Sequence, residues 1–451
     1  MKRLLVCSTL VALFGLGGQA FAVIGTIDDV PAATLLLPKF IVETDQNGVP
    51  VPGGLTTLFS VNNASAAPAL VHVTLWTNAS VPTLDFSIFL TGYDVVTVNM
   101  RDVFNGIVPQ TEHVTDADAI SPVGSFSTLV NPITLVGNGA PDSCDGSLPV
   151  GPVPGILVDF IRSVHRGGPS PLPQDGGACY AFATDFAEGY ITMDNVSQCT
   201  IQTPFDCDDG YSAILENVNQ IWGDYFYVDP ANNFAQGETL VHIEADASLE
   251  LTDYTFYRRY CQAASDQREG LASTFGVRYV ACDPLDPACA FTGGTTLKVW
   301  RDSKNIQVPQ VCNTARPGFP LGQNQIVLFD EDENPSVVPP SPFSPPVEDV
   351  LVPFPWEVNN TLVGSTSLPT PFDFGWAYLN LNFTQNAAPT VPFGSAAQNW
   401  VTAVWDADGL FSVGFDAIQF DNVTFEGPTP VIAPGRTDIC IGDAGAAGPC
   451  P

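Results

Sequence analysis

The residues with the clearest potential for chemistry lie between positions 222 and 246. Asp224, Asp229 and Glu244 are the candidate catalytic acids, because two carboxylates facing each other across a cleft can hydrolyse a glycosidic bond. The chain has 48 acidic residues, so no pair is singled out by number alone. The choice of these three depends on the aromatic residues beside them.

Three aromatic residues accompany the candidate acids in this stretch. Trp222, Tyr225 and Tyr227 are the candidate ligand-binding residues, since aromatic rings can stack on the rings of a sugar. Their alternative role is in the hydrophobic core. The stretch 222–229 is expected to be a strand, as is 240–246, where His242, Glu244 and Asp246 would share one face. That face is either a metal or acid-base site or an ordinary solvent face.

Acidic turns offer hard oxygen ligands, and calcium is the cofactor that these turns would suit. The candidate ligands are Asp206, Asp208, Asp209, Asp406 and Asp408. Neither the turn at 206–209 nor the turn at 406–408 has the full twelve-residue pattern that ends in a bidentate glutamate. Solvated turns are the alternative.

Motifs for other enzyme classes are absent from the sequence. There is no GxSxG, no HExxH and no glycine-rich phosphate loop, and the four histidines have no recognisable partner spacing. An enzyme is therefore not favoured.

Residues 1–22 have the pattern of a cleavable export signal. Lys2 and Arg3 precede an apolar stretch from Leu4 to Leu16, and the small residues of Ala20-Phe21-Ala22 form a cleavage site. The mature protein is thus expected in the periplasm or outside the cell, where disulfides form. The ten candidate disulfide cysteines are Cys144, Cys179, Cys199, Cys207, Cys261, Cys282, Cys289, Cys312, Cys440 and Cys450. Their connectivity stays open.

Charge and hydropathy limit the possible partners. The formal net charge is −33, so nucleic acid is not expected to bind. No second apolar run is long enough to cross a bilayer, so no integral membrane segment is expected in the mature chain. The hydrophobic fraction of 45% is sufficient for a buried core. A glycan or a protein at the cell exterior remains as the partner.

Alternation of apolar and polar residues predicts a mainly β fold, made of antiparallel β-sandwich domains with a loop-rich, disulfide-tied central region. Val71, Val73 and Leu75 alternate with polar or aromatic neighbours, which indicates a strand with one buried face. The predicted division is a signal at 1–22, an N-terminal β-sandwich at 23–110, a cysteine-containing central region at 111–334, a Pro-rich linker at 335–348 and a C-terminal β-rich region at 349–451. Whether the two β-rich ends form one domain or two stays open.

Four segments carry a resemblance to known sequences. These are TLLLPKF at 34–40, TLFSVNN at 57–63, LTGYDVVTVNMRD at 90–102 and FSVGFDA at 411–417. The chain resembles uncharacterised exported β-rich proteins of Gram-negative bacteria. The resemblance implies export and β-structure, and it implies no activity.

The function expected from the sequence is that of an exported non-enzymatic binding or structural protein of the cell surface, periplasm or extracellular matrix. Two alternatives are kept. One is an extracellular carbohydrate-active hydrolase that uses paired carboxylates. The other is a calcium-dependent adhesive component.

Overall fold

The computed structural model describes residues 30–107, 153, 155–171, 184–198, 203–204, 210–249, 255–259, 266–281, 293–302, 321–322, 325–337, 350–351, 353–382, 397–406 and 412–420. Within these ranges the chain is mainly β and its strand pairings are antiparallel, which confirms the predicted class. The predicted signal at 1–22, all ten mature-chain cysteines and Asp206, Asp208, Asp209 and Asp408 lie outside them. No helix in the described part of the chain is long and apolar enough to cross a membrane.

Two sheets that face each other form what we call the first unit. One sheet has the order β10 (Val241–Ile243), β1 (Thr34–Glu43), β6 (Phe186–Asn195), β3 (Ala69–Thr77) and β4 (Pro82–Leu90). The other has the order β5 (Val95–Asn99), β2 (Thr56–Asn63), β8 (Asp224–Asp229) and β9 (Phe234–Thr239), and β7 (Ile221–Trp222) also pairs with β2. Apolar side chains of both sheets join in one core, an arrangement consistent with the predicted β-sandwich.

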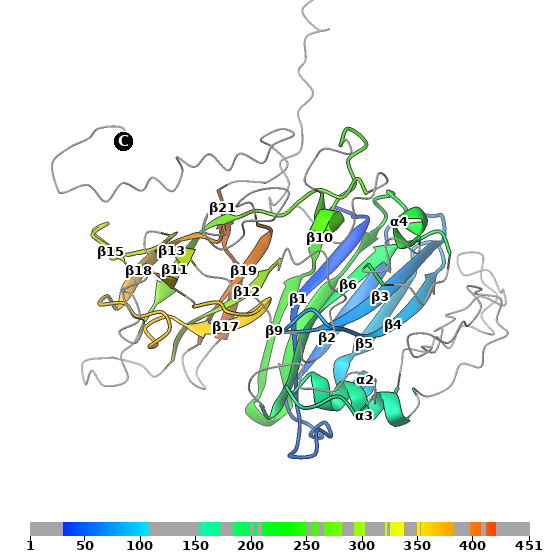
Figure 1. Ribbon diagram of the computed structural model, residues 1–451, viewed down its shortest axis with the longest axis horizontal. Coiled ribbons are helices and arrows are strands. Elements are labelled where there is room, and N and C mark those ends of the chain that lie inside the picture. Colours follow the sequence, from blue (N-terminus) through cyan, green and yellow to red (C-terminus); the bar gives the residue numbers. More distant parts are fainter. Residues whose placement is uncertain are drawn as a thin grey trace, which may run out of the picture.

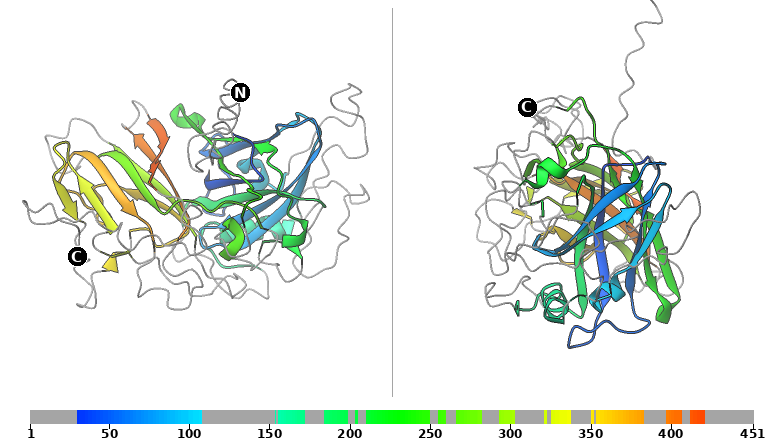
Figure 2. Two further views of the ribbon diagram at one scale, coloured as in Figure 1. Left: turned by 90° about the horizontal axis from the view of Figure 1, so that it is seen from above. Right: turned by 90° about the vertical axis from the view of Figure 1, so that its right-hand side faces the viewer.

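Two further sheets form the second unit. The first has the order β15 (Pro335–Val337), β14 (Ile326–Phe329), β18 (Phe374–Asn380), β11 (Thr274–Val280) and β21 (Ile418–Gln419). The second has the order β17 (Val358–Leu362), β12 (Gly294–Arg301), β19 (Asn399–Asp406) and β20 (Ser412–Asp416). A short pair, β13 (Leu321–Gly322) with β16 (Val350–Leu351), completes the strands. The two units lie side by side (Figures 1 and 2).

The sheets do not follow the predicted divisions of the sequence. Strands β6 to β10 lie beyond residue 110, and they complete both sheets that β1 to β5 begin. Long connections between paired strands cause this difference, since antiparallel neighbours need not be consecutive in the chain. The range predicted as a Pro-rich linker begins with Pro335 in strand β15, at the edge of its sheet. An edge strand tolerates a proline because its outer side needs no ladder hydrogen bond.

Helices are few and short in the described residues. α2 (Met100–Phe104) and α3 (Gly155–Val164) add apolar side chains to the core of the first unit, near one end of its sheets (Figure 1). α4 (Tyr211–Ile214) and η4 (Phe256–Arg259) instead contribute to a second apolar cluster. The remaining short helix is η3 (Pro230–Asn232).

The sheet that contains β3 is buried on both faces, not on one face as the alternation predicts. Val71, Val73 and Leu75 belong to the core between the sheets, while Trp76 belongs to the second cluster and is fully buried. That cluster also takes Trp300 from β12, so the second unit covers the outer face of this sheet. We call this contact between the units the seam.

Close packing around β6 leaves no room for a side chain at Gly189. A Cβ there would lie 2.0 Å from the carbonyl oxygen of Trp76 and 2.9 Å from the ring of Phe40. We expect Gly189→Ala to lower the free energy of unfolding by about 1–3 kcal/mol, the usual effect of overpacking, in a urea titration. Gly155→Ala is the matched control, because nothing lies within 4 Å of its added Cβ. Equal stability of the two variants would contradict the packing described here.

Candidate functional site

The outward face of β7 and β8 presents alternate residues of the predicted stretch 222–229. Trp222 is 36% exposed and Phe226 is 46% exposed, and Asp224 between them is partly buried. Leu58 of β2 is paired with Phe226, and it is partly exposed on the same face. These four side chains form what we call the aromatic strip.

Tyr225 and Tyr227 point the other way, into the core of the first unit. Each is 2% exposed, and their rings meet edge to face with centroids 5.4 Å apart. The hydroxyl of Tyr227 donates a hydrogen bond to the carbonyl oxygen of Lys39 at 2.8 Å. Of the three predicted ligand-binding aromatics, only Trp222 therefore reaches the surface. The two-residue period of a strand identifies Phe226 as the missed partner of Trp222.

Asp224 and Asp229, two of the three candidate catalytic acids, are not brought together as a pair. Asp224 and Asp229 occupy opposite ends of β8, about 17 Å apart at 3.3 Å per residue. A glycosidase pair stands about 5–9.5 Å apart. Asp229 also has a structural role, because its carboxylate accepts hydrogen bonds from the backbone N–H groups of Ala231 and Asn232 at the start of η3.

Glu244 follows β10 in the other sheet of the first unit and lies near two other acids, Asp246 and Glu269. Its carbonyl oxygen accepts a hydrogen bond from the backbone N–H of Glu269 at 2.9 Å. Burial, together with the negative charges of Asp246 and Glu244, raises the pKa of Glu269 to about 8. The predicted strand face of 242, 244 and 246 thus gains an acid from residue 269, which sequence spacing does not indicate.

The structure describes one of the candidate calcium ligands. Asp406 is the last residue of β19, where it pairs with Gly294 and Ser412. Within the described ranges no three or more His, Cys, Asp or Glu residues are grouped so that they could hold a metal ion.

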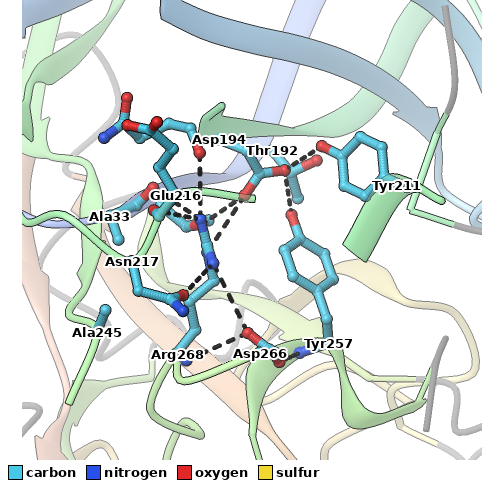
Figure 3. Close-up of polar contacts among 12 residues, drawn as sticks. Ala33, Thr192, Asp194, Tyr211, Glu216, Asn217, Ala245, Tyr257, Asp266 and Arg268 are labelled. Atoms are coloured by element: carbon cyan, nitrogen blue, oxygen red, sulfur yellow. Dashed lines mark hydrogen bonds and ion pairs between the residues drawn. The ribbon is translucent and has the colours of Figure 1, made fainter. Parts of the chain in front are cut away.

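A buried arginine lies at the centre of a polar network beside the seam (Figure 3). Arg268 is 0% exposed, and its guanidinium forms ion pairs with Asp194 at 3.6 Å and Asp266 at 3.8 Å. Its N–H groups also donate to five oxygen acceptors, which are the Thr34 hydroxyl, the Asn217 side chain and the carbonyls of Ala33, Asn195 and Glu216. Protein groups therefore compensate the buried charge.

Asp194 is the other charged centre of this network and is also fully buried. Its carboxylate accepts hydrogen bonds from the hydroxyls of Thr34 at 2.5 Å, Tyr211 at 2.6 Å and Tyr257 at 2.6 Å. Burial and the nearby Asp194 charge raise the pKa of both tyrosines well above the usual range, so their hydroxyls stay protonated as donors. With all these groups engaged, the geometry is that of a structural network, which residue spacing in the sequence does not reveal.

A second group of charged residues lies where β9 of the first unit meets β20 of the second. A Cβ at Gly414 would lie 2.3 Å from a carboxylate oxygen of Glu238, which shows how closely the strands approach. Asp416 accepts hydrogen bonds from the indole N–H of Trp400 at 3.1 Å and the hydroxyl of Thr402 at 3.0 Å. Lys298 of β12 lies over the ring of Tyr227, with its amine 3.5 Å from the ring centroid.

Burial changes the protonation of this second group. Desolvation and the charge of Asp416 raise the pKa of Glu238 to about 7, and desolvation raises the pKa of Asp416 to about 6. Desolvation and the nearby Lys39 hold the pKa of Lys298 well below its usual range, against the opposing effect of Glu238 and Glu188. The contact between the units therefore contains carboxyl groups that change charge near neutral pH.

Comparison of the chain with protein-family models, with curated proteins and with solved structures finds no match.

We expect Arg268→Met to lower the free energy of unfolding by about 3–5 kcal/mol, because it leaves the buried Asp194 without its cationic partner. Denaturant unfolding of the purified protein measures this loss. Asp185→Asn is the control, since its side chain is 85% exposed in its ion pair with Arg166 and exposed pairs contribute only about 0–1 kcal/mol. Similar losses in the two variants would contradict the central role of Arg268.

Glu238→Gln should make stability less dependent on pH. Between its ordinary pKa of 4.5 and its folded pKa of about 7, Glu238 holds a proton in the folded chain that it lacks when unfolded. Stability from this group therefore falls as pH rises through that window. Urea midpoints at pH 5 and pH 8 test the change. The pKa values of His165 and Glu269 are also shifted by folding, but both groups titrate in the wild type and in the variant, so comparison of the two proteins removes their contributions.

The exposed Asp332 supplies the control for this measurement. Asp332→Asn should keep the pH profile of the wild type. A Glu238→Gln profile parallel to that of the wild type would show that the carboxyl group does not sense the contact between β9 and β20.

Proposed function

We propose that this protein is an exported, non-enzymatic binding protein whose ligand is a neutral glycan at the cell exterior. The observation that carries the proposal is the aromatic strip, in which Trp222 and Phe226 stand exposed on either side of Asp224 on a sheet face. The exposed aromatics lie on strands rather than on a long loop, so their positions are set by the sheet.

The chemistry of the aromatic strip suits a sugar. The apolar face of a pyranose ring can stack on an indole or phenyl ring, and burial of such anchors supplies much of the energy of an interface. A carboxylate accepts hydrogen bonds only, so Asp224 between the two rings can accept from sugar hydroxyl groups. Regular sheet geometry fixes the spacing of the three side chains before the ligand arrives, which limits the loss of conformational entropy on binding.

Charge favours a neutral ligand over an anionic one. The formal net charge of −33 repels polyanions, including nucleic acid and acidic polysaccharides, at ordinary ionic strength. The export signal predicted at 1–22 would deliver the chain to a compartment where neutral polysaccharides occur. Both considerations support a neutral polysaccharide as the partner.

Depletion of the purified protein by insoluble cellulose or chitin tests the proposal. We expect the wild type to bind at least one of them, and Trp222→Ala or Phe226→Ala to weaken binding about tenfold or more, equivalent to about 1.4 kcal/mol. Phe374→Ala is the matched control, because Phe374 is 47% exposed but lies on β18 of the second unit. It should bind as the wild type does.

Two results would contradict this function. If neither polysaccharide depletes the wild type, or if the double variant of Trp222 and Phe226 binds equally well, the aromatic strip is not a glycan site. Release of soluble sugar that disappears in Asp224→Asn would instead identify a hydrolase. Melting temperatures of all variants, measured in parallel, separate lost binding from lost folding.

A further inference from the structure

Three side chains with complementary chemistry meet at the edge of the seam, away from the aromatic strip. The amine of Lys39 donates a hydrogen bond to one carboxylate oxygen of Glu188 at 3.0 Å. The side-chain amide of Asn78 donates to the other oxygen of the same carboxylate at 3.1 Å. One carboxylate thus binds an amine through one oxygen and a primary amide through the other.

The strands place these residues on three neighbouring segments of one sheet. Lys39 belongs to β1 and Glu188 to the central strand β6, while Asn78 follows the last residue of β3. The pairing of β1 with β6 shifts register between Leu37 and Phe40, so Lys39 sits in an irregularity of the kind that re-aims a side chain. Both outer residues therefore reach towards Glu188 from opposite sides.

The three groups are shielded from water. Lys39 is 2% exposed and Asn78 is 4% exposed, and the side chain of Glu188 is 15% exposed. The backbone on both sides is held in place. Tyr227 donates to the carbonyl oxygen of Lys39, and the backbone N–H of Glu357 in the second unit donates to that of Asn78 at 3.2 Å. The backbones that carry Lys39 and Asn78 are thus held in place on either side of Glu188.

We infer that Lys39 and Asn78 form an intramolecular amide bond, with Glu188 as the group that moves the protons. In this step Glu188 takes a proton from the Lys39 ammonium, and the freed amine attacks the side-chain carbonyl carbon Cγ of Asn78. Glu188 passes this proton to Nδ2, the bond between Cγ and Nδ2 of Asn78 breaks, and the second proton released by the attached Nζ leaves with the ammonia as an ammonium ion. The products are a Lys39 Nζ–Asn78 Cγ amide and one ammonium ion, so no oxidant, cofactor or energy source is consumed.

Asn78 supplies a further indication of this chemistry. Its side-chain oxygen Oδ1 is buried and has no hydrogen-bond partner among the described residues. A half-turn of the amide brings Oδ1 to the position beside Glu188, where the protonated carboxyl group donates to it and polarises the carbonyl. Holding reacting groups close together lowers the activation free energy below that of the same reaction between separate molecules.

Asn78 rather than Glu188 is the electrophile for a chemical reason. An ionised carboxylate repels a nucleophile and has no good leaving group, whereas an amide can expel ammonia once it is protonated. The resulting bond would join β1 to the turn after β3 across the central strand β6, and it would close a loop in the unfolded chain. This cross-link is independent of glycan binding.

A peptide map of the purified full-length protein, with its cysteines reduced, tests the cross-link. After digestion with trypsin and chymotrypsin together, we expect no cleavage after Lys39, and a branched peptide in which the segments around Lys39 and Asn78 are joined with the loss of one ammonia. Lys39→Arg and Glu188→Gln should each yield only linear peptides. Glu238→Gln is the matched control and should retain the branch. Glu238, like Glu188, is an acid near Lys298, but Glu188 is the carboxylate to which Lys39 and Asn78 donate.

The wild-type map decides the matter even if a variant fails to fold. Linear peptides that contain unmodified Lys39 and Asn78 would overturn the inference. So would a branched peptide in the Glu188→Gln variant, or ammonia loss found only as a succinimide at Asn47-Gly48 while the peptides with Lys39 and Asn78 stay linear. A mass lower by one water rather than one ammonia would identify a Lys39–Glu188 bond and would equally overturn it.

Discussion

The buried guanidinium of Arg268 is the constraint on which the arrangement of the two units depends. A charge without access to water is stable only when it is paired and its donors are satisfied. Arg268 meets this need with oxygens from β1, β6 and the segment at 216–217, all in the first unit, and with Asp266 on its own segment. That segment leads directly into β11, so the point where the chain passes into the second unit is held against the first unit.

The polar network and the apolar seam reinforce each other. Asp194 and its tyrosine donors lie beside the cluster that contains Trp76 and Trp300, and that cluster excludes water from the ion pair. The network in turn satisfies polar groups that the cluster would otherwise bury alone. The sheet of β1, β3 and β6 is therefore covered on both faces, an unusual position for antiparallel strands, which commonly face solvent on one side.

The proposed function rests on the surface that this packing leaves exposed. The sheet of β2, β7 and β8 keeps its outer face towards solvent, and there the alternation of β8 turns Tyr225 and Tyr227 inward and Phe226 outward. Asp224 lies between the two exposed rings of Trp222 and Phe226 on this face. A binding face on a rigid double-sheet unit is the arrangement that these facts support.

The sequence determined the class of the fold and the positions of many strands. The alternation at 71–75 and 413–417 and the strand predicted at 222–229 fall on residues that lie in or next to strands, because the two-residue period comes from the backbone itself. Alternation could not say which face of β8 is buried. Tyr225, Phe226 and Tyr227 are all aromatic. The sequence is therefore equally compatible with the two tyrosines pointing into the core and with Phe226 pointing into it.

Only the tertiary structure decided which distant strands share a sheet and which charges meet. Thr34, Asp194 and Arg268 are separated by long stretches of sequence, and so are Lys39, Asn78 and Glu188. Pairing of β1 with β6 and of β6 with β3 brings each set together. Local propensity sets the strands one at a time, but burial of both faces of a sheet is a property of the whole packed chain, so the sites that it creates are not encoded in the spacing of neighbouring residues.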